Sequence, residues 1–169
     1  HLLAAGHETT INGIGNTMWT ILREPGVRDE LLHDPSLIPN AVAESLRIEA
    51  PVQFLFRQVT QDRELAGVQI PAGARVAAVF ASANRDETMF PDPDRFDIHR
   101  ANAGRHLAFG FGIHRCVGEP LSLRELHLTV ELLLLRLPNL RLTPGQSFEH
   151  NPHPFLRRLK ELHLEFDRL

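Results

Sequence analysis

The only cysteine of the chain lies in Phe109-Gly110-Phe111-Gly112-Ile113-His114-Arg115-Cys116-Val117-Gly118. Three glycines surround it, and glycine lets the backbone adopt positive φ and approach a flat or bulky ligand without a Cβ in the way. A long amphipathic pattern begins directly afterwards, so a helix N-terminus and Arg115 are both expected to favour thiolate over thiol. The segment therefore predicts a thiolate at the mouth of a glycine loop, acting as a nucleophile or as a metal ligand.

Three other interpretations of Cys116 stay open at this point. A lone cysteine is often a buried thiol that packs as a small hydrophobe. His106 and His114 lie close enough in sequence for a zinc site, although structural zinc usually recruits paired cysteines. A cysteine hydrolase would place its thiolate at a helix start and take its base from a distant histidine, but the sequence marks none of its ten histidines as that base.

Apolar periodicity interrupted by proline and glycine predicts three helices in the first fifty residues. The third, from about Leu37 to Ile48, carries Glu44 and Arg47 three positions apart on one face. An isolated pair at this spacing is usually a surface ion pair. The apolar residues around this one instead predict a buried pair, which needs further partners such as Arg95 or backbone carbonyls. The expected helix bounds are residue 1 to about Leu22, Val27 to about Asp34, and Leu37–Ile48.

The sequence pattern of the rest of the chain changes from alternating to irregular and then to helical. Alternating segments predict short strands at Phe54–Thr60 and Ala74–Phe80, and residues 84–118 are expected to be mostly irregular, which inside a compact domain usually indicates function. A long helix is predicted over Glu119–Leu137, with Leu121, Leu128, Leu132 and Leu135 near helical spacing. Two or three strands are expected after Pro138, ending in Leu162–Phe166.

The segment Ala5-Gly6-His7-Glu8-Thr9-Thr10 is unusual for a helix interior, because glycine and threonine are poor helix formers. Hydroxyl side chains that bond the preceding turn favour local widening of the helix. A widened turn that carries an acid and hydroxyls suits water-mediated proton delivery. Two threonines packed in a helix contact are the alternative of comparable weight.

Together these features resemble the C-terminal part of a cytochrome P450, a haem-thiolate monooxygenase of the soluble bacterial type. The family signature F-x-x-G-x-x-x-C-x-G matches Phe109, Gly112, Cys116 and Gly118, and the motif A-G-x-[DE]-T-[TS] matches the segment that begins at Ala5. The family's E-x-x-R pair corresponds to Glu44 and Arg47, and its P-x-R-F meander to Pro93, Arg95 and Phe96, in the family's order. The resemblance implies a mainly α fold with a minor antiparallel β part.

The resemblance also implies roles for individual residues. Cys116 would be the axial thiolate of haem b, with Phe109 packed near it and the N–H groups of the loop around Gly110 tuning its donor strength. Arg57 and His114 match positions that bind haem propionates. Thr9 would hold water and dioxygen while Glu8 feeds protons. Glu44, Arg47 and Arg95 match a structural triad, and the substrate would lie near Ala4, Ala5, Val52–Phe56 and Pro154-Phe155.

The implied reaction is insertion of one oxygen atom from O2 into a hydrophobic small molecule. Electrons would come from NAD(P)H through a ferredoxin-type donor, with Arg105, Arg115 and Arg124 as candidate contacts. One departure concerns the helix after the cysteine loop, where Glu119 replaces the small residue usual in the family. We therefore expect this helix to pack differently against the proximal face of the haem.

Length and composition agree with a soluble globular protein. The 169 residues are about one domain's worth, with 43% hydrophobic and 23% charged residues. The formal charge of −3 lacks the basic excess of a nucleic-acid binder. The longest purely apolar run, Leu132–Leu135, is far too short for a membrane span, no signal segment opens the chain, and a lone cysteine suits a reducing compartment. We therefore expect a cytoplasmic protein that binds neither nucleic acid nor membrane.

The start of the chain predicts a fragment. His1 opens an apolar helix with neither an initiator methionine nor a capping residue. We expect residues 1–169 to be a single-domain fragment that contains the oxygen-activating helix, the E-x-x-R helix, a small β part, the meander, the cysteine loop and the helix that follows. A truncated haem-binding chain without catalysis is therefore the main alternative to an active monooxygenase, ahead of a hydrolase that uses Cys116.

Overall fold

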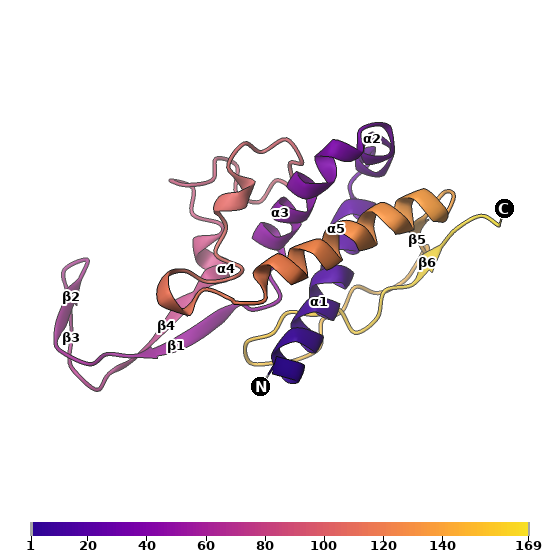
Figure 1. Cartoon of the computed structure of the whole chain (residues 1–169). Helices are drawn as coiled ribbons and strands as arrows, with labels where there is room; N and C mark the ends of the chain where they lie inside the picture. Colours follow the sequence, from indigo (N-terminus) through magenta and orange to yellow (C-terminus); the bar gives the residue numbers. More distant parts are fainter. Residues whose placement is uncertain (1, 169) are drawn as a thin grey trace.

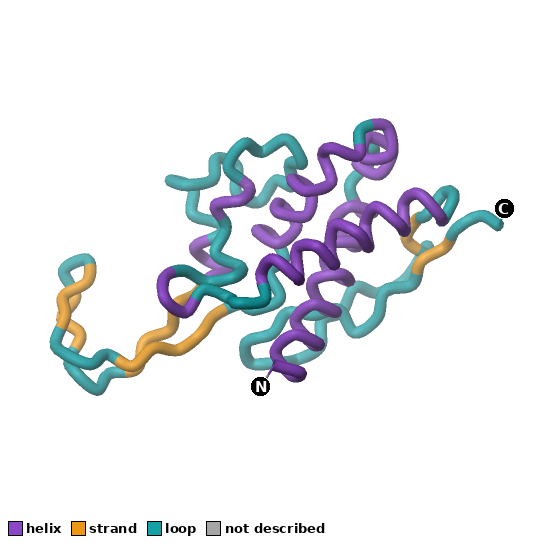
Figure 2. Tube along the Cα trace, viewed as in Figure 1, coloured by secondary structure: helices purple, strands orange, loops and turns teal. Residues whose placement is uncertain are grey.

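The computed structural model describes residues 2–168, apart from the side chains of Leu2 and Ala4. The described residues form α-helices with short 3-10 turns and small antiparallel sheets (Figures 1 and 2). The helices are α1 (Leu2–Arg23), α2 (Val27–His33), α3 (Ile38–Ile48), α4 (Phe80–Ala83) and α5 (Glu119–Arg136), with 3-10 turns η1 (Pro35–Leu37), η2 (Ala103–Arg105) and η3 (Gly112–His114). The strands are β1 (Phe54–Gln58), β2 (Arg63–Leu65), β3 (Val68–Ile70), β4 (Arg75–Val79), β5 (Arg141–Leu142) and β6 (Leu164–Glu165).

Proline and glycine set most helix ends where the sequence predicts them. After α1 the chain turns at Gly26, whose φ of 82° lies in the left-handed region that favours glycine. Pro39 lies in the first turn of α3 and Pro120 in the first turn of α5, where a missing N–H costs nothing. The predicted bounds of α1, α2, α3 and α5 are confirmed to within one or two residues.

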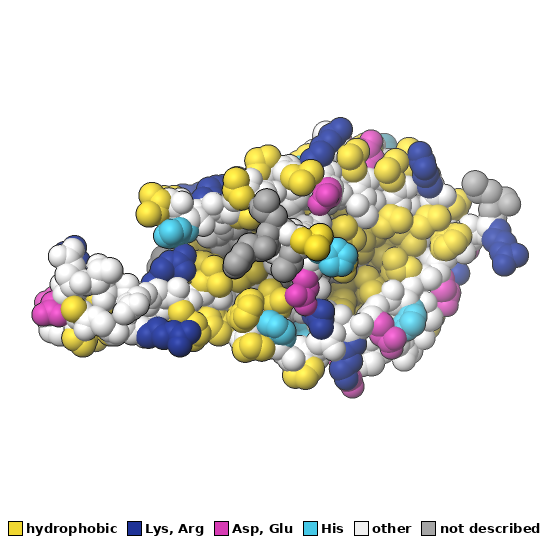
Figure 3. All heavy atoms as spheres, turned by 60° about the horizontal axis from the view of Figure 1, so that its bottom comes forward, with side chains coloured by type: hydrophobic (Ala, Val, Ile, Leu, Met, Phe, Trp, Pro, Cys, Tyr) yellow, Lys and Arg dark blue, Asp and Glu magenta, His cyan; other side chains and the backbone are white. Residues whose placement is uncertain are grey.

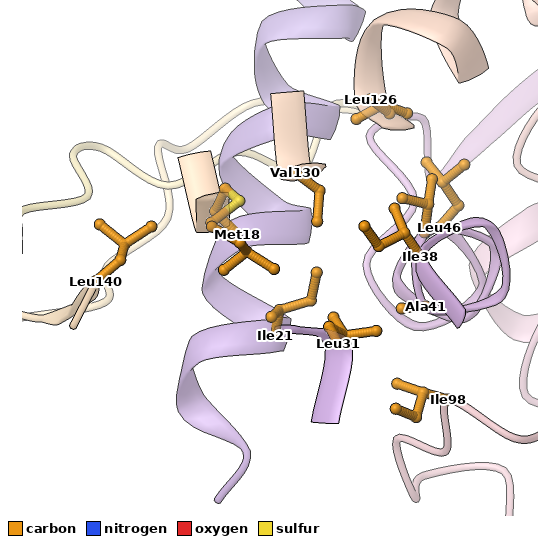
Figure 4. Packing of buried hydrophobic residues seen from close by; sticks show 12 residues of the cluster. Met18, Ile21, Leu31, Ile38, Ala41, Leu46, Ile98, Leu126, Val130 and Leu140 are labelled. Carbon is orange, nitrogen blue, oxygen red and sulfur yellow. The ribbon is translucent and has the colours of Figure 1, made fainter. Parts of the chain in front are cut away.

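The core lies where α1, α3 and α5 meet. In Figure 1, α5 crosses α1, and both helices contact α3. Figure 4 shows the apolar side chains that these helices direct toward one another, with additions from α2 and the loops. Buried members of the cluster are Met18, Ile21, Leu31, Ile38, Ala41, Val42, Leu46, Ile98, Leu126, Val130, Leu134 and Leu140.

The buried face of α5 differs from the predicted one. Leu126, Val130 and Leu134, each one turn apart, point into the core. Leu121 and Leu135, which we expected on the apolar face, are 65% and 71% exposed. Because α5 carries leucines around most of its circumference, periodicity alone could not select the buried side.

The β part forms an arm that projects from the helices (Figure 2). Strands β1 and β4 pair antiparallel, with Phe54 opposite Val79 and Gln58 opposite Arg75, and β2 and β3 form a hairpin at the far end. The expected strand through Phe80 ends one residue earlier, because Phe80 begins α4. After Pro138, the only strands among the described residues are β5 and β6, each two residues long.

No helix among residues 2–168 is both long and apolar enough to span a bilayer.

Candidate functional site

The cysteine loop has the backbone that its glycines predict. Gly110 and Gly112 have φ values of 70° and 76°, a conformation that side-chain-bearing residues rarely adopt. The backbone N–H of Cys116 donates to the carbonyl of Phe109 at 2.9 Å, which closes the loop on itself. The Cys116 thiol is exposed, which is wrong for the interpretation as a buried hydrophobe. An exposed thiol on a closed loop is in position to meet a ligand.

Arg115, the residue before the cysteine, forms an ion pair with Glu119. Its guanidinium donates to both carboxylate oxygens of Glu119, at 2.5 and 2.6 Å, across the first turn of α5. The Arg115 side chain is 53% exposed and that of Glu119 only 16%. Hydrogen bonds from Arg115 hold the pKa of Glu119 below its usual range. The cation expected to favour the thiolate is therefore largely neutralised, and Glu119 fixes the turn that bears Cys116.

His106 braces the start of the same loop. Its Nδ1 accepts the backbone N–H of Ala108 at 3.2 Å, and its ring lies 5.9 Å from that of Phe109. Burial lowers the pKa of His106 from 6.5 to about 4; nearby Glu119 opposes this shift, whereas Arg115 adds to it. A neutral ring is therefore built into the loop as a hydrogen-bond acceptor.

His106→Asn is expected to remove part of the protein's sensitivity to acid. Because the pKa of His106 is lower in the folded protein than in the unfolded chain, the folded state binds fewer protons at about pH 5. The contribution of His106 to stability is therefore complete above about pH 6.5 and is lost as the pH falls toward about 4. The full shift of the His106 pKa corresponds to about 3 kcal/mol of stability. Asparagine keeps an acceptor for Ala108 but does not titrate. Urea unfolding at pH 7 and pH 4.5 is expected to show a smaller stability difference in this variant, with exposed His33→Asn as the control. If the stability difference between pH 7 and pH 4.5 were the same as in the wild type, the lowered pKa of His106 would be contradicted.

A buried ionic network supports the loop from α3. The Arg47 guanidinium donates to both oxygens of Glu44, at 2.7 and 2.8 Å, and both side chains are fully buried. The buried pair is therefore confirmed, as are its backbone partners: Arg47 donates to the carbonyls of Asn84, Pro93 and Arg95.

Arg100, rather than Arg95, completes the triad by its side chain. The Arg100 Nε donates to Glu44 Oε1 at 2.9 Å, and its other N–H groups bind the carbonyls of Pro91, Asp92 and Arg95. The Arg95 side chain is exposed, and only its carbonyl joins the network. The prediction for Arg95 is wrong because the folded loop, not the motif, decides which arginine reaches Glu44.

Asn84 connects this network to the cysteine loop, a role that no motif in the sequence indicates. Its carbonyl accepts from Arg47 at 2.9 Å, while its side-chain Oδ1 accepts the backbone N–H of Leu107 at 2.6 Å. The residue is fully buried. Asn84 therefore ties the start of the loop that bears Cys116 to α3.

The α1 motif lies beside the helix that follows the cysteine. The Thr9 hydroxyl donates to the carbonyl of Ala5 at 2.6 Å, as its position predicts. The Thr10 hydroxyl lies 3.4 Å from that of Ser122 on α5, which places α1 against the helix that the cysteine loop begins. The helix is α-helical throughout, so the expected widening does not take the form of a π turn. The Glu8 carboxylate binds Arg158 at 2.9 Å.

The cationic side chain of Arg57 and the imidazole of His114 are both exposed. Arg57 lies on β1, and its Nη1 donates to the carbonyl of neighbouring Phe56 at 2.9 Å. His114 ends η3, two residues before Cys116. Their role as propionate partners stays a prediction.

The expected substrate-facing segments lie side by side where they are described. The Gln53 backbone N–H donates to the carbonyl of Phe155 at 2.8 Å, and Val52 forms a bridge with Leu156. The Ala5 side chain is exposed on α1, whereas the Ala4 side chain lies outside the described residues.

Large apolar side chains are exposed near these groups. They include Phe56 on β1, Phe111 and Ile113 in the cysteine loop, and Ile11 on α1, which are 48%, 79%, 97% and 53% exposed. Figure 3 shows hydrophobic side chains gathered across one face, with Lys and Arg side chains at the base of the β arm. Such a surface suits a large apolar ligand with an anionic edge.

The competing interpretations of Cys116 gain no support. Within residues 2–168, no three His, Cys, Asp or Glu side chains come close enough to hold a metal ion, so the zinc site is absent there. None of the hydrogen bonds among these residues joins the Cys116 thiol to a histidine, as a hydrolase would require.

Comparisons with known proteins agree on one family. The family model described as Cytochrome P450 matches residues 32–166. Cytochrome P450 monooxygenase PikC of Streptomyces venezuelae is 45% identical over 170 residues, which cover 99% of this chain and 40% of that protein.

Solved structures show the same architecture. The CYP116B5 haem domain of Acinetobacter radioresistens superposes with a TM-score of 0.94 at 36% identity, over 98% of this chain and 40% of that one. CYP109E1 of Bacillus megaterium, solved in complex with testosterone, has a TM-score of 0.94 at 36% identity, over 99% of this chain and 46% of that one. The expected fold class is thereby confirmed, and the chain spans less than half the length of these relatives.

Proposed function

The chain belongs to the cytochrome P450 family, and on that premise we propose that the protein is a haem-dependent monooxygenase. It inserts one oxygen atom from O2 into a hydrophobic small molecule, with electrons from NAD(P)H delivered by a ferredoxin-type donor. The observation that carries the proposal is the exposed thiol of Cys116, held on a closed glycine loop at the start of α5.

The residues present fit haem b. The macrocycle is flat and apolar, and the exposed apolar side chains of the cysteine loop, β1 and α1 offer it walls. Its iron accepts a thiolate ligand, which Cys116 supplies. Its propionates require cationic partners, and Arg57 and His114 are exposed and available for them. Gly110 and Gly112, at positive φ, leave the loop backbone free of a Cβ atom at these two positions.

Each residue then has a defined task. Bound haem supplies the activation of dioxygen, favoured by electron donation from the Cys116 thiolate. Backbone N–H groups around Gly110 and the packing of Phe109 tune that donation. The network of Glu44, Arg47 and Arg100, through Asn84, keeps the loop in place.

Proton supply is the task of α1. The Thr9 hydroxyl already donates its proton to Ala5, so its oxygen is free to accept a hydrogen bond. Glu8, one residue earlier, is the only carboxylate of α1 and supplies protons to the site through water.

Thr9→Ala is expected to uncouple oxygenation without loss of haem. Without the hydroxyl, protons and dioxygen are poorly placed, and reducing equivalents are lost as peroxide. We expect about a tenfold fall in product formed per NAD(P)H consumed. Thr10→Ala, whose hydroxyl faces Ser122 instead, is the matched control. Unchanged coupling in Thr9→Ala would remove this residue from the mechanism.

The substrate class rests on the apolar surface and on relatives. CYP109E1 binds testosterone, a compact apolar molecule, and the exposed apolar side chains described above suit a molecule of that kind. For the electron donor, Arg105 and Arg124 are candidate contacts, whereas Arg115 is already paired with Glu119. A free thiol that must stay reduced favours the cytoplasm.

The test is isotopic. Haem-loaded protein is supplied with NAD(P)H, a ferredoxin with its reductase, ¹⁸O2 and a panel of steroids. We expect product that carries one ¹⁸O atom. Haem binding through thiolate with no labelled product from any compound would favour the second candidate, a haem-binding chain without turnover. The observation behind this second candidate is that the chain spans 40% of the PikC monooxygenase and 40% of the CYP116B5 haem domain.

A further inference from the structure

An ion pair joins two segments that are 150 residues apart. Arg158 Nη1 donates to Glu8 Oε1 at 2.9 Å and so links the C-terminal segment to α1. Their side chains are 38% and 43% exposed. Pairs this accessible contribute little to stability, about 0–1 kcal/mol. The Glu8 carboxylate can therefore leave Arg158 at low cost, which suits a group that moves.

The backbone around Arg158 is firmly held, in contrast to the pair. The carbonyl of Arg157 accepts from buried Asn16 on α1 at 3.1 Å, and its N–H donates to Pro51 at 2.8 Å. The Arg157 side chain pairs with Glu49, which is 3% exposed. The base of Arg158 is thus fixed relative to α1, and only its side chain is free to reorient.

Two buried donors lie at the same place without partners. Arg158 Nε and Asn12 Nδ2 are buried, and neither has a hydrogen-bond partner among the described residues. Asn12 is only 6% exposed. Both residues line a cleft of about 510 Å³ together with Glu8, His7, Ile11 and Leu3. Buried donors of this kind are usually satisfied by ordered water.

We propose that Arg158 is a positioning residue for proton delivery, which holds the Glu8 carboxylate at a water-filled cleft between α1 and the C-terminal segment. The inference rests on the proposed function. Glu8 takes a proton that bulk solvent supplies as hydronium through water in the cleft, so that no hydroxide is left behind, and passes it to the oxygen of Thr9. The Thr9 hydroxyl turns away from the Ala5 carbonyl as it releases its own proton to the reaction. Both side chains then return to their starting protonation states, and one proton has moved inward. Arg158 recaptures the carboxylate after each transfer.

The first part of the test needs no haem. In ¹⁵N spectra of the purified chain, the Arg158 Nε–H is expected to exchange slowly with solvent, and Glu8→Gln is expected to accelerate that exchange severalfold by releasing the guanidinium. Exchange that is equally fast in both proteins would show that the pair does not form, and would overturn the proposal whatever the haem ligand is.

The second part uses the haem-loaded protein. Arg158→Met is expected to lower the yield of product per NAD(P)H about tenfold and to raise the solvent deuterium isotope effect on product formation at least twofold. Arg158→Lys is expected to restore most of both. Lys160→Met, which breaks a similarly exposed pair with Glu149 in the same segment, is the matched control.

Failure of the Arg158 proposal and failure of the proposed function give different results. A normal thiolate spectrum together with wild-type coupling and isotope effect in Arg158→Met would overturn the role of Arg158 alone. An equal loss of coupling in Lys160→Met would also overturn the role of Arg158. The loss would then follow from breaking any ion pair of the C-terminal segment. Absence of the thiolate spectrum in the wild-type protein would instead overturn the proposed function.

Discussion

Replacing Cys116 with histidine is expected to leave haem bound and to abolish oxygenation. Imidazole is a good iron ligand, and the closed loop around Gly110 and Gly112 does not depend on the thiol, since it is held by backbone bonds. A neutral imidazole, however, does not donate the electron density that a thiolate does. Changes to groups that only support a metal ligand typically cost 10–100-fold, so replacing the ligand itself is expected to cost more.

Two measurements on the same sample check this prediction. Haem content by pyridine extraction is expected to stay near one per chain, and labelled product from ¹⁸O2 is expected to fall to background. Oxygenation at the wild-type rate would contradict the assignment of Cys116 as the thiolate ligand of the iron. Activity on an ester or amide without haem, lost on alkylation of Cys116, would point to the hydrolase instead.

Arg47→Met is expected to cause the largest loss of stability of any single change proposed. The variant leaves the fully buried Glu44 without its bidentate partner and strips a donor from the carbonyls of Asn84 and Pro93. Breaking a buried pair in this way costs about 3–5 kcal/mol, a large part of the 5–15 kcal/mol typical of a domain. For a chain of this size we expect the melting temperature to fall by about 10 °C.

The control is an arginine in exposed ion pairs. Arg141 binds Glu165 and Asp167 at 3.2 and 3.0 Å with its side chain 45% exposed, so Arg141→Met is expected to change stability by less than about 1 kcal/mol. Calorimetry on both variants decides the matter. Equal melting temperatures would show that the network around Glu44 does not hold the fold, and that the cysteine loop is positioned by other contacts.

Local chemistry allowed much of the fold to be predicted. Pro25-Gly26, Pro51 and Pro138 mark places where helices must stop, and α1, α3 and α5 end before them. The burial of Glu44 and Arg47 followed from the apolar residues beside them. Positive φ at Gly110 and Gly112 followed from the spacing of glycines near Cys116.

What could not be predicted depends on which distant residues meet. Four arginines lie between positions 85 and 105, and only the path of the folded loop selects Arg100 for Glu44. Asn84 and Leu107 are 23 residues apart, and Arg158 and Glu8 are 150 apart, so no local pattern connects them. The buried face of α5 was missed because its leucines surround the helix.

The most direct test of the central claim is the absorption spectrum of the haem-loaded protein, reduced and saturated with CO. We predict a Soret band at the long wavelength characteristic of thiolate ligation, which would place Cys116 on the iron. A band at the position expected for histidine ligation or for free haem, in protein that is folded by circular dichroism, would contradict the account.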